Sequence, residues 1–395
     1  MSFETEVLNL IRKDEATNLL QQLVRIPSPT GEEKAVAEFV YETLKSLGLK
    51  TEIFEPIPNR PDVVGFLEGS EGKPTLILNG HLDHVPPGNL EDWTYPPYEG
   101  RIVDGKMYGR GAADMKGGLT SMIIAAKAIK EANVQLKGNL ILTFAVGEEV
   151  GDPGTRYIVV DKGIKGDWGI VTEPTVFKGR FRIGVAERGV AWFKITVKGK
   201  STHASQPHLG VNAISKAGKV VSELEKLNVR LARRKHPLIG ASACSVTVIR
   251  GGFKENVIPD NCEITVDRRM IPSENPKNAE KEIEKILKNI RKKDPKFRFS
   301  MERTCLFEPA EIPSNHEIVR VVRKNLKQVC GYDTKPWGTP YACDARNLIN
   351  DAGIPAIVFG PGDISNCHCI DEYIVLDEVV DAAKILALTA LNLLT

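Results

Sequence analysis

Histidines and acidic residues stand in this sequence at points where apolar runs end. His81 and Asp83 follow the run 74–80, Glu148 and Glu149 follow 140–146, Glu173 follows 168–172, Asp114 lies in a glycine-rich segment, and His368 lies far downstream. Zinc is bound in proteins by histidine nitrogen and carboxylate oxygen, and a catalytic zinc keeps one position open for water. These residue types are therefore those that a pair of zinc ions would need.

His81 and Asp83 lie two residues apart at the end of an expected strand. A histidine that binds a metal usually donates its other ring N–H to an acceptor, which fixes the tautomer of the ring. Asp83 is expected either to be that acceptor or to orient the backbone around the ligand. The neighbouring His84 is expected to be structural.

Asp114 is expected at the start of a helix, where backbone N–H groups stabilise an anion. One carboxylate can bridge two cations, with one oxygen on each. The pattern Gly109-x-Gly111-x-x-Asp114 also nearly matches the dinucleotide fingerprint G-x-G-x-x-G. An aspartate in place of the third glycine would repel a pyrophosphate, so the sequence disfavours that alternative.

Glu148 and Glu149 are adjacent carboxylates at a strand end. Because neighbouring side chains point in different directions, one can bind metal while the other moves a proton. A solvated acidic turn is the alternative for such a pair taken alone.

Three further polar residues, His203, Asn256 and Arg269, lie in the middle of the chain. Arginine binds a carboxylate through two parallel hydrogen bonds, so Arg269 is a candidate substrate anchor. A salt bridge at a strand end is the alternative for Arg269. His203 taken alone fits a structural role as well as a functional one.

The chain has 395 residues, more than one hydrophobic core usually supports, so two domains are expected. Strand and helix patterns alternate over 1–183 and again over 304–395, which predicts an α/β fold with a mostly parallel sheet covered by helices. Residues 184–303 show the order β-α-β-β-α-β of a ferredoxin-like unit. Since His368 must rejoin the first half, this α+β segment is expected to be an inserted domain.

The net charge is +2 and both signs are interspersed, which gives no reason to expect nucleic-acid or membrane binding. No signal peptide and no membrane span are expected, and seven scattered cysteines indicate a cytoplasmic protein. Cys367 and Cys369 flank His368. They are expected to be small buried residues lining the site, with metal ligation by a thiol as the alternative.

Taken together, these motifs resemble the family of zinc-dependent acetylornithine deacetylases, succinyl-diaminopimelate desuccinylases, aminoacylases and carboxypeptidase G. The resemblance covers nearly the whole chain, and the motifs occur in the family's order. They are Ile26-Pro27-Ser28, His81-Leu82-Asp83, the segment from Gly109 to Gly118, Glu148-Glu149, Glu173-Pro174-Thr175, His203-Ala204-Ser205, Asn256 to Asp260, Asp267-x-Arg269, and Gly360-Pro361-Gly362 before His368.

The resemblance implies a role for each matching residue. His81 and Glu173 would bind one zinc, Glu149 and His368 the other, and Asp114 would bridge them. Glu148 would be the general base. His203 would complete the partner subunit's site, since the family's inserted domain often forms a homodimer. The family also implies a cis peptide bond after Asp114.

Two segments depart from the family pattern. Cys367-His368-Cys369 replaces the more usual alanine before the histidine and proline two residues after it, which affects the expected metal preference and redox sensitivity. The segment from Tyr341 to Arg346 matches the family only loosely, which leaves substrate recognition there open.

The sequence thus predicts a cytoplasmic hydrolase of N-acyl amino acids with two zinc ions per subunit, for which cobalt or manganese could substitute. Arg269 and Asn256 would hold the substrate carboxylate, and the small-molecule substrate would be the partner, beside a second copy of the chain. A small-peptide exopeptidase is the alternative within the same fold. A non-catalytic binding protein is disfavoured, because five ligands and a base are all present.

Overall fold

The computed structural model describes residues 3–395 of the chain. The chain forms two compact units. The first contains residues up to Val185, Ile312–Trp337 and Cys343–Thr395, and the second contains Ala186–Glu311 with Gly338–Ala342. The second unit thus ends later than the predicted residue 303, because β18 (Arg298–Phe307) stays paired with β11 (Gly189–Lys198) as far as Phe307.

The sheet of the first unit has parallel strands in its centre and antiparallel strands outside. The order is β1 (Lys50–Ile57), β2 (Arg60–Leu67), β6 (Asn139–Ala145), β3 (Thr75–His81), β7 (Trp168–Val171), β21 (Ala356–Val358) and β10 (Ile183–Glu187). The pairs β6–β3, β3–β7 and β7–β21 are parallel, and the others are antiparallel. The α/β class is confirmed, and the parallel part is limited to the four central strands.

Helices cover both faces of this sheet, as the contacts of strand β3 show. All seven residues of β3 are buried. Successive side chains of a strand point to opposite faces. A Cβ at Gly80 would meet Leu119 of α4 (Gly117–Glu131), whereas the Asn79 amide donates to Thr155 of α5 (Gly154–Arg156) at 2.9 Å. A strand buried on both faces reads as the continuous apolar run seen in the sequence.

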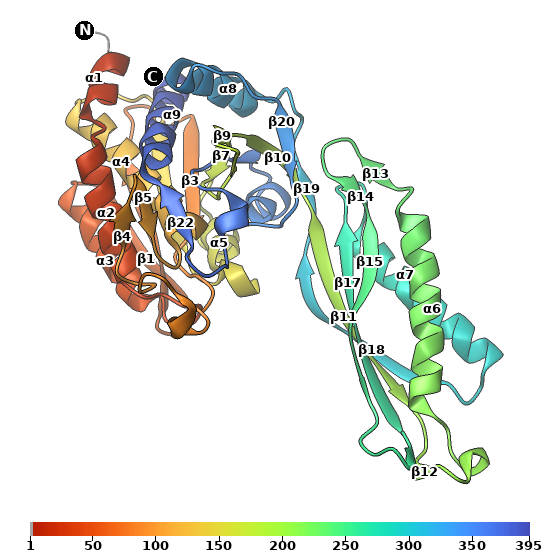
Figure 1. Cartoon of the computed structure of the whole chain (residues 1–395). Coiled ribbons are helices and arrows are strands. Elements are labelled where there is room, and N and C mark those ends of the chain that lie inside the picture. Colours follow the sequence, from red (N-terminus) through yellow and green to blue (C-terminus); the bar gives the residue numbers. More distant parts are fainter. Residues whose placement is uncertain (1–2) are drawn as a thin grey trace. The chain divides into compact units, whose positions relative to one another are not determined.

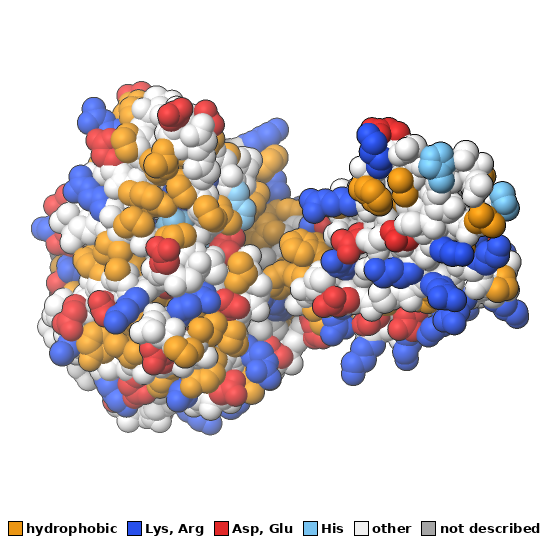
Figure 2. Space-filling model, turned by 90° about the horizontal axis from the view of Figure 1, so that it is seen from below, with side chains coloured by type: hydrophobic (Ala, Val, Ile, Leu, Met, Phe, Trp, Pro, Cys, Tyr) orange, Lys and Arg blue, Asp and Glu red, His pale blue; other side chains and the backbone are white. Residues whose placement is uncertain are grey.

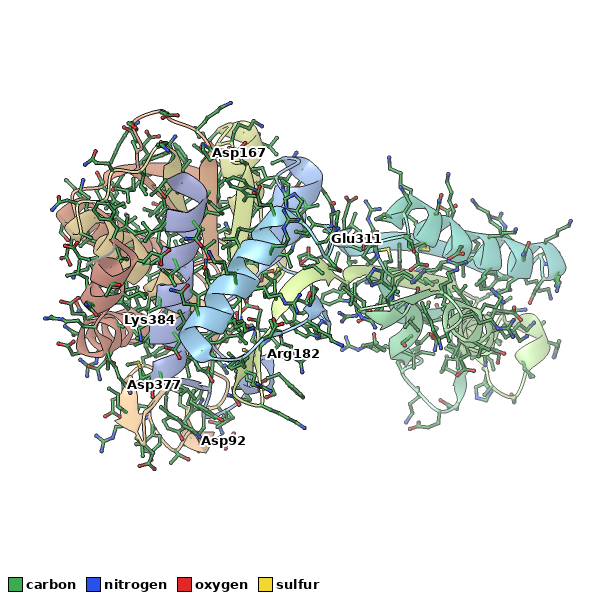
Figure 3. All side chains as sticks on the ribbon, turned by 90° about the horizontal axis from the view of Figure 1, so that it is seen from above. Asp92, Asp167, Arg182, Glu311, Asp377 and Lys384 are labelled. Carbon is green, nitrogen blue, oxygen red and sulfur yellow. The ribbon has the colours of Figure 1, made fainter. Side chains whose placement is uncertain are left out.

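The other helices of the first unit pack around this framework (Figure 1). α9 (Leu376–Leu394) lies against α4 and α8 (Glu317–Cys330), and α3 (Lys34–Ser46) packs on β1 and β2. Most of α9 is buried, and Asp377 and Lys384 are among its few side chains that reach solvent (Figure 3). The chain begins with two helices, α1 (Phe3–Leu10) and α2 (Lys13–Arg25), which are separate because Arg12 has an extended backbone.

Small strand pairs complete the first unit. β4 (Arg101–Val103), β5 (Lys106–Tyr108) and β22 (Tyr373–Val375) form a three-stranded sheet, and β8 (Val176–Phe177) pairs with β9 (Arg180–Phe181). The long segment 86–113, which is rich in glycine and proline, therefore contains two strands. Strand β5 of this segment pairs with β22, which lies more than 250 residues downstream. This pairing brings the region of His368 close to the region of Asp114.

The second unit is an antiparallel sheet with the order β15 (Ala243–Gly251), β17 (Asn261–Met270), β11 and β18, and it is packed by α6 (Ala213–Leu231) and α7 (Pro276–Lys293). Along the chain the order is β-α-β-β-α-β, as the sequence pattern predicts. Burial alternates strictly along β17, so its inward residues join the core beneath both helices. Short pairs β12 (Thr202–His203)–β16 (Val257–Ile258) and β13 (Lys235–His236)–β14 (Gly240–Ala241) extend from it.

Strands β19 (Ala310–Glu311) and β20 (Pro336–Thr339) lie where the chain passes between the units. Among residues 3–395, no helix is long and apolar enough to cross a bilayer. Positive and negative side chains are interspersed over the face of the first unit seen in Figure 2, as the balanced composition led us to expect.

Candidate metal centre

The carboxyl ends of the central strands bring three of the proposed ligand-bearing segments together. His81 ends β3, Glu148 and Glu149 lie in a 3₁₀ turn after β6, and Glu173 follows β7 by two residues. Ligands of open α/β sheets commonly bind at this edge. His81 Nε2 lies 3.3 Å from Glu173 Oε1 and 3.2 Å from Asp114 Oδ1.

His368 meets the other side of the same aspartate. Its Nε2 lies 3.1 Å from Asp114 Oδ2 and 3.1 Å from Glu149 Oε1. The two oxygens of Asp114 therefore face two different histidines, and each histidine has one further carboxylate. This is the arrangement in which one carboxylate can bridge two cations.

Distance alone also suggests two other groupings of possible ligands. The ligand atoms of His81, Asp114 and Glu149 lie within 4.8 Å of one another, as do those of His81, Glu148 and Glu173. Both groups use His81, whose Nε2 has a single lone pair and can serve only one metal. We therefore prefer the assignment from direct contacts, with His81 and Glu173 on one side of Asp114 and His368 and Glu149 on the other.

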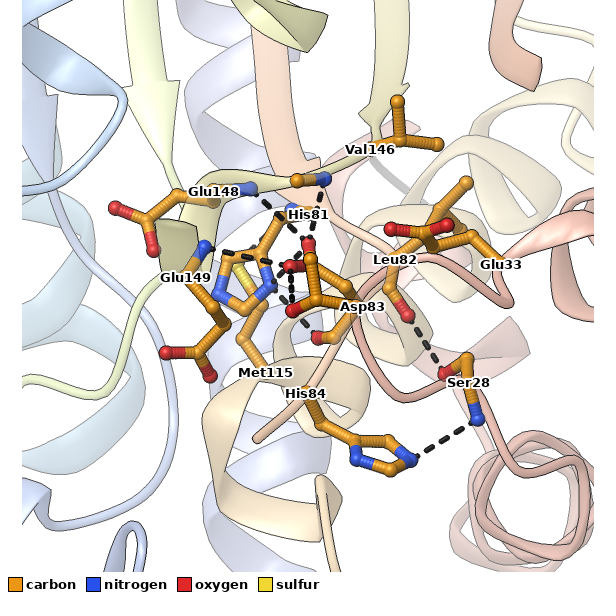
Figure 4. A network of polar contacts seen from close by, with 12 residues as sticks. Ser28, Glu33, His81, Leu82, Asp83, His84, Met115, Val146, Glu148 and Glu149 are labelled. Carbon is orange, nitrogen blue, oxygen red and sulfur yellow. Dashed lines mark hydrogen bonds and ion pairs between the residues drawn. The ribbon is translucent and has the colours of Figure 1, made fainter. Parts of the chain in front are cut away.

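Asp83 supports both the histidine and the acidic turn (Figure 4). His81 Nδ1 donates to the backbone carbonyl of Asp83 at 2.9 Å, which leaves Nε2 with its lone pair for a metal. The Asp83 carboxylate accepts from the backbone N–H groups of Gly147 (2.9 Å), Glu148 (3.1 Å) and Glu149 (3.3 Å). Of the two roles considered from sequence, the carboxylate thus orients the backbone, while the main-chain carbonyl fixes the ring.

Glu148 and Glu149 extend from this turn in different directions, as Figure 4 shows. Glu149 reaches His368, whereas Glu148 Oε1 lies 3.8 Å from Arg346 Nη1. Burial raises the pKa of Glu148 well above its usual value, with the nearby charge of Glu173 acting in the same direction and that of His81 opposing it. Glu148 is therefore a largely enclosed carboxyl whose pKa is raised in the metal-free protein.

The remaining acids form a cluster that a cation would stabilise. Burial, with the charge of Asp114, raises the pKa of Glu173 to about 8 and also raises that of Glu149. Hydrogen bonds to Asp114 and Glu149 raise the pKa of His368 to about 10. Burial opposes a charge on His81, but the carboxylates around it outweigh burial and raise its pKa. Protons here balance negative charge that a divalent cation would balance instead, and the nitrogen and oxygen donors fit zinc.

The glycine-rich segment around Asp114 serves close packing. Gly111 has a φ of 78°, and a Cβ at Gly118 would lie 2.1 Å from the carbonyl oxygen of Thr172. The Asp114–Met115 peptide bond is cis, which confirms the expectation from the family resemblance. The glycines are thus explained by backbone conformation and contact rather than by a dinucleotide.

His84 and the two cysteines beside His368 are not among the possible metal ligands. His84 is buried, with its Nε2 accepting from Ser28 N at 3.0 Å and its Nδ1 donating to Val85 O at 2.8 Å, so both ring nitrogens are used structurally. Within residues 3–395, no thiol joins a cluster of possible metal ligands. Cys367 is partly buried, but the expectation of burial is wrong for Cys369, which is exposed.

Three residues of this region were not identified from the sequence. Arg346 lies beside Glu148, and Asp344 is buried and accepts from Thr155 Oγ1 at 2.6 Å. Both belong to the segment whose match to the family is loose. Glu372 accepts from the backbone N–H of Asp114 at 3.2 Å. Its only sequence signal was its position four residues after His368.

His203, Asn256 and Arg269 belong to the second unit. His203 lies in β12 and is exposed, and its Nδ1 is 2.7 Å from Ser205 Oγ. Asn256 is exposed, and its carbonyl accepts from Ala204 N at 2.9 Å. Arg269 pairs with Asp267 through Nε (2.8 Å) and Nη2 (2.9 Å), so within this unit it makes the salt bridge considered as its alternative. The roles of these three residues toward a substrate stay predictions.

The chain is similar to known proteins over most of its length. The sequence model described as peptidase family M20/M25/M40 matches residues 77–392. An N-formyl-4-amino-5-aminomethyl-2-methylpyrimidine deformylase from Halalkalibacterium halodurans is 31% identical over 404 residues, covering 95% of this chain and 93% of the relative.

Two solved structures share the fold. An M20 family metallo-carboxypeptidase from Sulfolobus solfataricus has a TM-score of 0.83 at 20% identity and covers 96% of this chain and 99% of its own. A dinuclear metal binding peptidase of the M20 family from Bacillus subtilis has a TM-score of 0.73 at 19% identity, covering 96% and 98%.

Proposed function

The chain belongs to peptidase family M20/M25/M40, and on that premise we propose that it removes the acyl group from an N-acyl amino acid or a closely similar small amide, using two zinc ions. As a member of this family it is a metal-dependent hydrolase of amide bonds. The observation that carries the proposal is the position of Asp114, whose two oxygens face His81 and His368.

The donor set supports two adjacent metals. One metal would take His81, Glu173 and one oxygen of Asp114, and the other would take His368, Glu149 and the second oxygen. Two-metal hydrolases hold their ions roughly 3.5–4 Å apart, a span that one bridging carboxylate covers. The M20 family peptidase from Bacillus subtilis is described as binding a dinuclear metal, which agrees with this proposal. Cobalt or manganese would be accepted by the same ligands.

Zinc, when bound, polarises a carbonyl oxygen and lowers the pKa of a coordinated water. The chain's own contribution to proton transfer is Glu148, which would take the proton of the attacking water and return it to the leaving amine. The Glu148 side chain is 11% exposed and shares its turn with the proposed ligand Glu149, a position that suits this double task. Asp83 keeps Glu148 in place through the backbone of its turn.

Substrate recognition is proposed for the second unit. Arg269 and Asn256 would hold the substrate carboxylate, with Arg269 exchanging Asp267 for the substrate. His203 would donate to the oxyanion of the partner subunit's site in a homodimer formed through the inserted domain. The exposed position of His203 on β12 supports a role toward a group outside its own unit.

A small-peptide exopeptidase is the second candidate. The chemistry would be the same, and only the group on the acyl side would differ. The likeness in fold to an M20 metallo-carboxypeptidase over 96% of this chain favours it, whereas the 31% identity to a deformylase favours removal of a small acyl group.

A hydrolysis screen tests the proposal. N-formyl, N-acetyl and N-succinyl amino acids would be compared with dipeptides, each with added zinc, cobalt or manganese. We expect turnover of an N-acyl amino acid that disappears with a chelator and in the metal-loaded Glu148→Ala variant. Hydrolysis of dipeptides alone would establish the exopeptidase instead, and turnover that survives full metal removal would contradict both candidates.

A further inference from the structure

Three chain segments carry the ligands of the His368 half of the centre, and Glu372 joins two of them, the loop of His368 and the segment of Asp114. Glu372 is fully buried. Its Oε1 accepts from the backbone N–H groups of Ala113 (2.9 Å) and Asp114 (3.2 Å), and its Oε2 accepts from Arg110 Nη1 at 2.6 Å. One carboxylate therefore holds the backbone on which the bridging ligand Asp114 stands. We call these contacts the Glu372 clamp.

The backbone of Glu372 strengthens the same connection. Its carbonyl accepts from Gly109 N at 2.9 Å, and the next residue, Tyr373, pairs with Tyr108 between β22 and β5. Asp371 is fixed as well, because its carboxylate accepts from Thr94 N (2.8 Å) and Thr94 Oγ1 (2.7 Å). The short loop from His368 to Tyr373 is thus anchored at its downstream end to the segment that carries Asp114.

The other half of the centre is held in a different way. His81 is the last residue of a fully buried central strand, and its ring is fixed by the carbonyl of Asp83. Glu173 follows β7 and is 4% exposed. His81 and Glu173 are therefore positioned by the sheet and by Asp83, without the Glu372 clamp. His368 lies in a loop between the turn Ile364–Asn366 and β22. Its side chain is 50% exposed, and its φ is 60°.

We propose that Glu372 is a positioning residue for the metal centre, which sets the affinity of the His368 half far more than that of the His81 half. The inference rests on the proposed two-metal function. Residues outside the coordination sphere that orient metal ligands typically change metal affinity about 10–100-fold when replaced. Asp114 contributes to both halves, but only the His368 half takes two of its three ligands from segments joined by the clamp.

The Glu372→Gln variant isolates this role by hydrogen-bond chemistry. The glutamate accepts three hydrogen bonds, whereas glutamine offers one acceptor oxygen and a donor NH₂ group. If the oxygen faces Ala113 and Asp114, the NH₂ group faces the guanidinium of Arg110, donor against donor. The size of the side chain is kept, so the change acts on the clamp and leaves the surrounding core filled.

Glu33 provides a matched control. It is also fully buried, its Oε1 accepts from Gly31 N at 3.0 Å, and its Oε2 accepts from Arg60 Nε at 2.8 Å. In the part of the chain that the structure describes, no contact between Glu33 and the five proposed ligands is found. Glu33→Gln therefore removes a buried arginine partner of the same kind without a direct contact to the proposed metal ligands.

The test is a zinc titration of the metal-free full-length protein against a competing chromophoric chelator. We expect two binding steps in the wild type and in Glu33→Gln. In Glu372→Gln, one step should weaken ~10–100-fold while the other changes less than about threefold. Equal weakening of both steps, or no weakening, would overturn the inference.

Two further measurements keep the inference separate from the proposed function. A wild type that binds fewer than two zinc ions would overturn the two-metal function and the inference with it, whereas failure in Glu372→Gln alone overturns only the inference. If Glu372→Gln does not fold, Arg110→Lys replaces it, because lysine keeps the charge but loses the planar guanidinium. We expect a smaller loss confined to the same step, and unchanged binding in Arg110→Lys would refute the clamp.

Discussion

His81 and His368 face the two oxygens of one carboxylate, but they come from different kinds of structure. His81 is 1% exposed and ends a strand that is hydrogen-bonded on both sides. His368 lies in a loop, and half of its side chain is exposed. The sheet fixes His81 through many backbone hydrogen bonds, whereas the position of His368 depends on a few contacts such as those of Asp371 and Glu372.

The difference indicates which half of the proposed two-metal centre is held more firmly by the fold. The strand-borne half stands on a part of the fold that must form for the protein to fold at all. The loop-borne half can be lost without loss of the sheet, since local stability varies across a structure and loops lie at its low end. The predictions below test this contrast, beginning with the largest expected effect.

The sharpest test compares His81→Ala with His368→Ala. Each variant should lose one metal and nearly all activity, because a ligand is removed outright. Only His81→Ala should also destabilise the metal-free protein, by about 1–3 kcal/mol, since it empties a buried site beside partnered carboxylates. Metal analysis and urea unfolding of both apoproteins measure this. Equal losses of stability would contradict the contrast between strand and loop.

Glu148→Ala should separate chemistry from metal binding within one turn. Glu148 contacts Arg346, whereas its neighbour Glu149 contacts His368. If Glu148 is the general base, its loss should lower activity about 100–10,000-fold with both metals retained. Glu149→Ala is the matched control and should lose metal. Activity close to wild type in metal-loaded Glu148→Ala would rule out its role as base.

The strand-borne half could be predicted from sequence because its signals are local. Apolar runs predict β3, β6 and β7, and parallel strands bring the residues that follow them to one edge. His81, Glu149 and Glu173 could be grouped on that basis. The resemblance to a family supplied what the pattern could not, namely a proposal for which residue would bind which metal.

The loop-borne half could not be predicted because its contacts join distant segments. The residues around Glu372 form no sequence pattern that predicts its hydrogen bond to the backbone of Asp114, 258 residues earlier. Strands β4 and β5 lie in a segment rich in glycine and proline, a composition that does not predict strands. Their sheet forms because β5 pairs with both β4 and the distant β22. Arg346 was missed for the same reason, since only the folded chain places it beside Glu148.

His203→Ala tests a contribution from the second unit. If His203 donates to the oxyanion of the partner subunit's site, its loss should lower kcat by ~100-fold with little change in metal content. Mixing inactive Glu148→Ala and His203→Ala proteins under conditions that exchange subunits should restore activity, because a mixed dimer has one site with both residues. Verified mixed dimers that stay inactive would refute action across an interface.

The smallest expected effect on activity concerns an acid outside the proposed metal centre. Asp62 lies in β2, its Oδ1 accepts from Val146 N at 2.9 Å, and its Oδ2 has no hydrogen-bond partner among the described residues. Burial raises its pKa to about 8. Unlike Glu173, Asp62 is not among the clustered possible ligands, so no bound metal is expected to offset the cost of its charge.

The sign of the pH effect follows from proton binding. Between the unfolded pKa near 4 and the folded pKa near 8, the folded chain keeps a proton on Asp62 that the unfolded chain has lost. Stability therefore falls as pH rises through this window, by up to about 1.4 kcal/mol per pH unit from this group.

Asp62→Asn should remove that slope, so the variant should gain stability relative to the wild type between pH 5 and pH 8. Urea unfolding at both pH values, with and without zinc, measures the difference. The gain should be the same in both conditions, because it does not depend on the metal centre. A gain that vanishes when zinc is added would mean that the ionisation of Asp62 is coupled to metal binding. That result would contradict the distinction between Asp62 and the acids of the proposed metal centre.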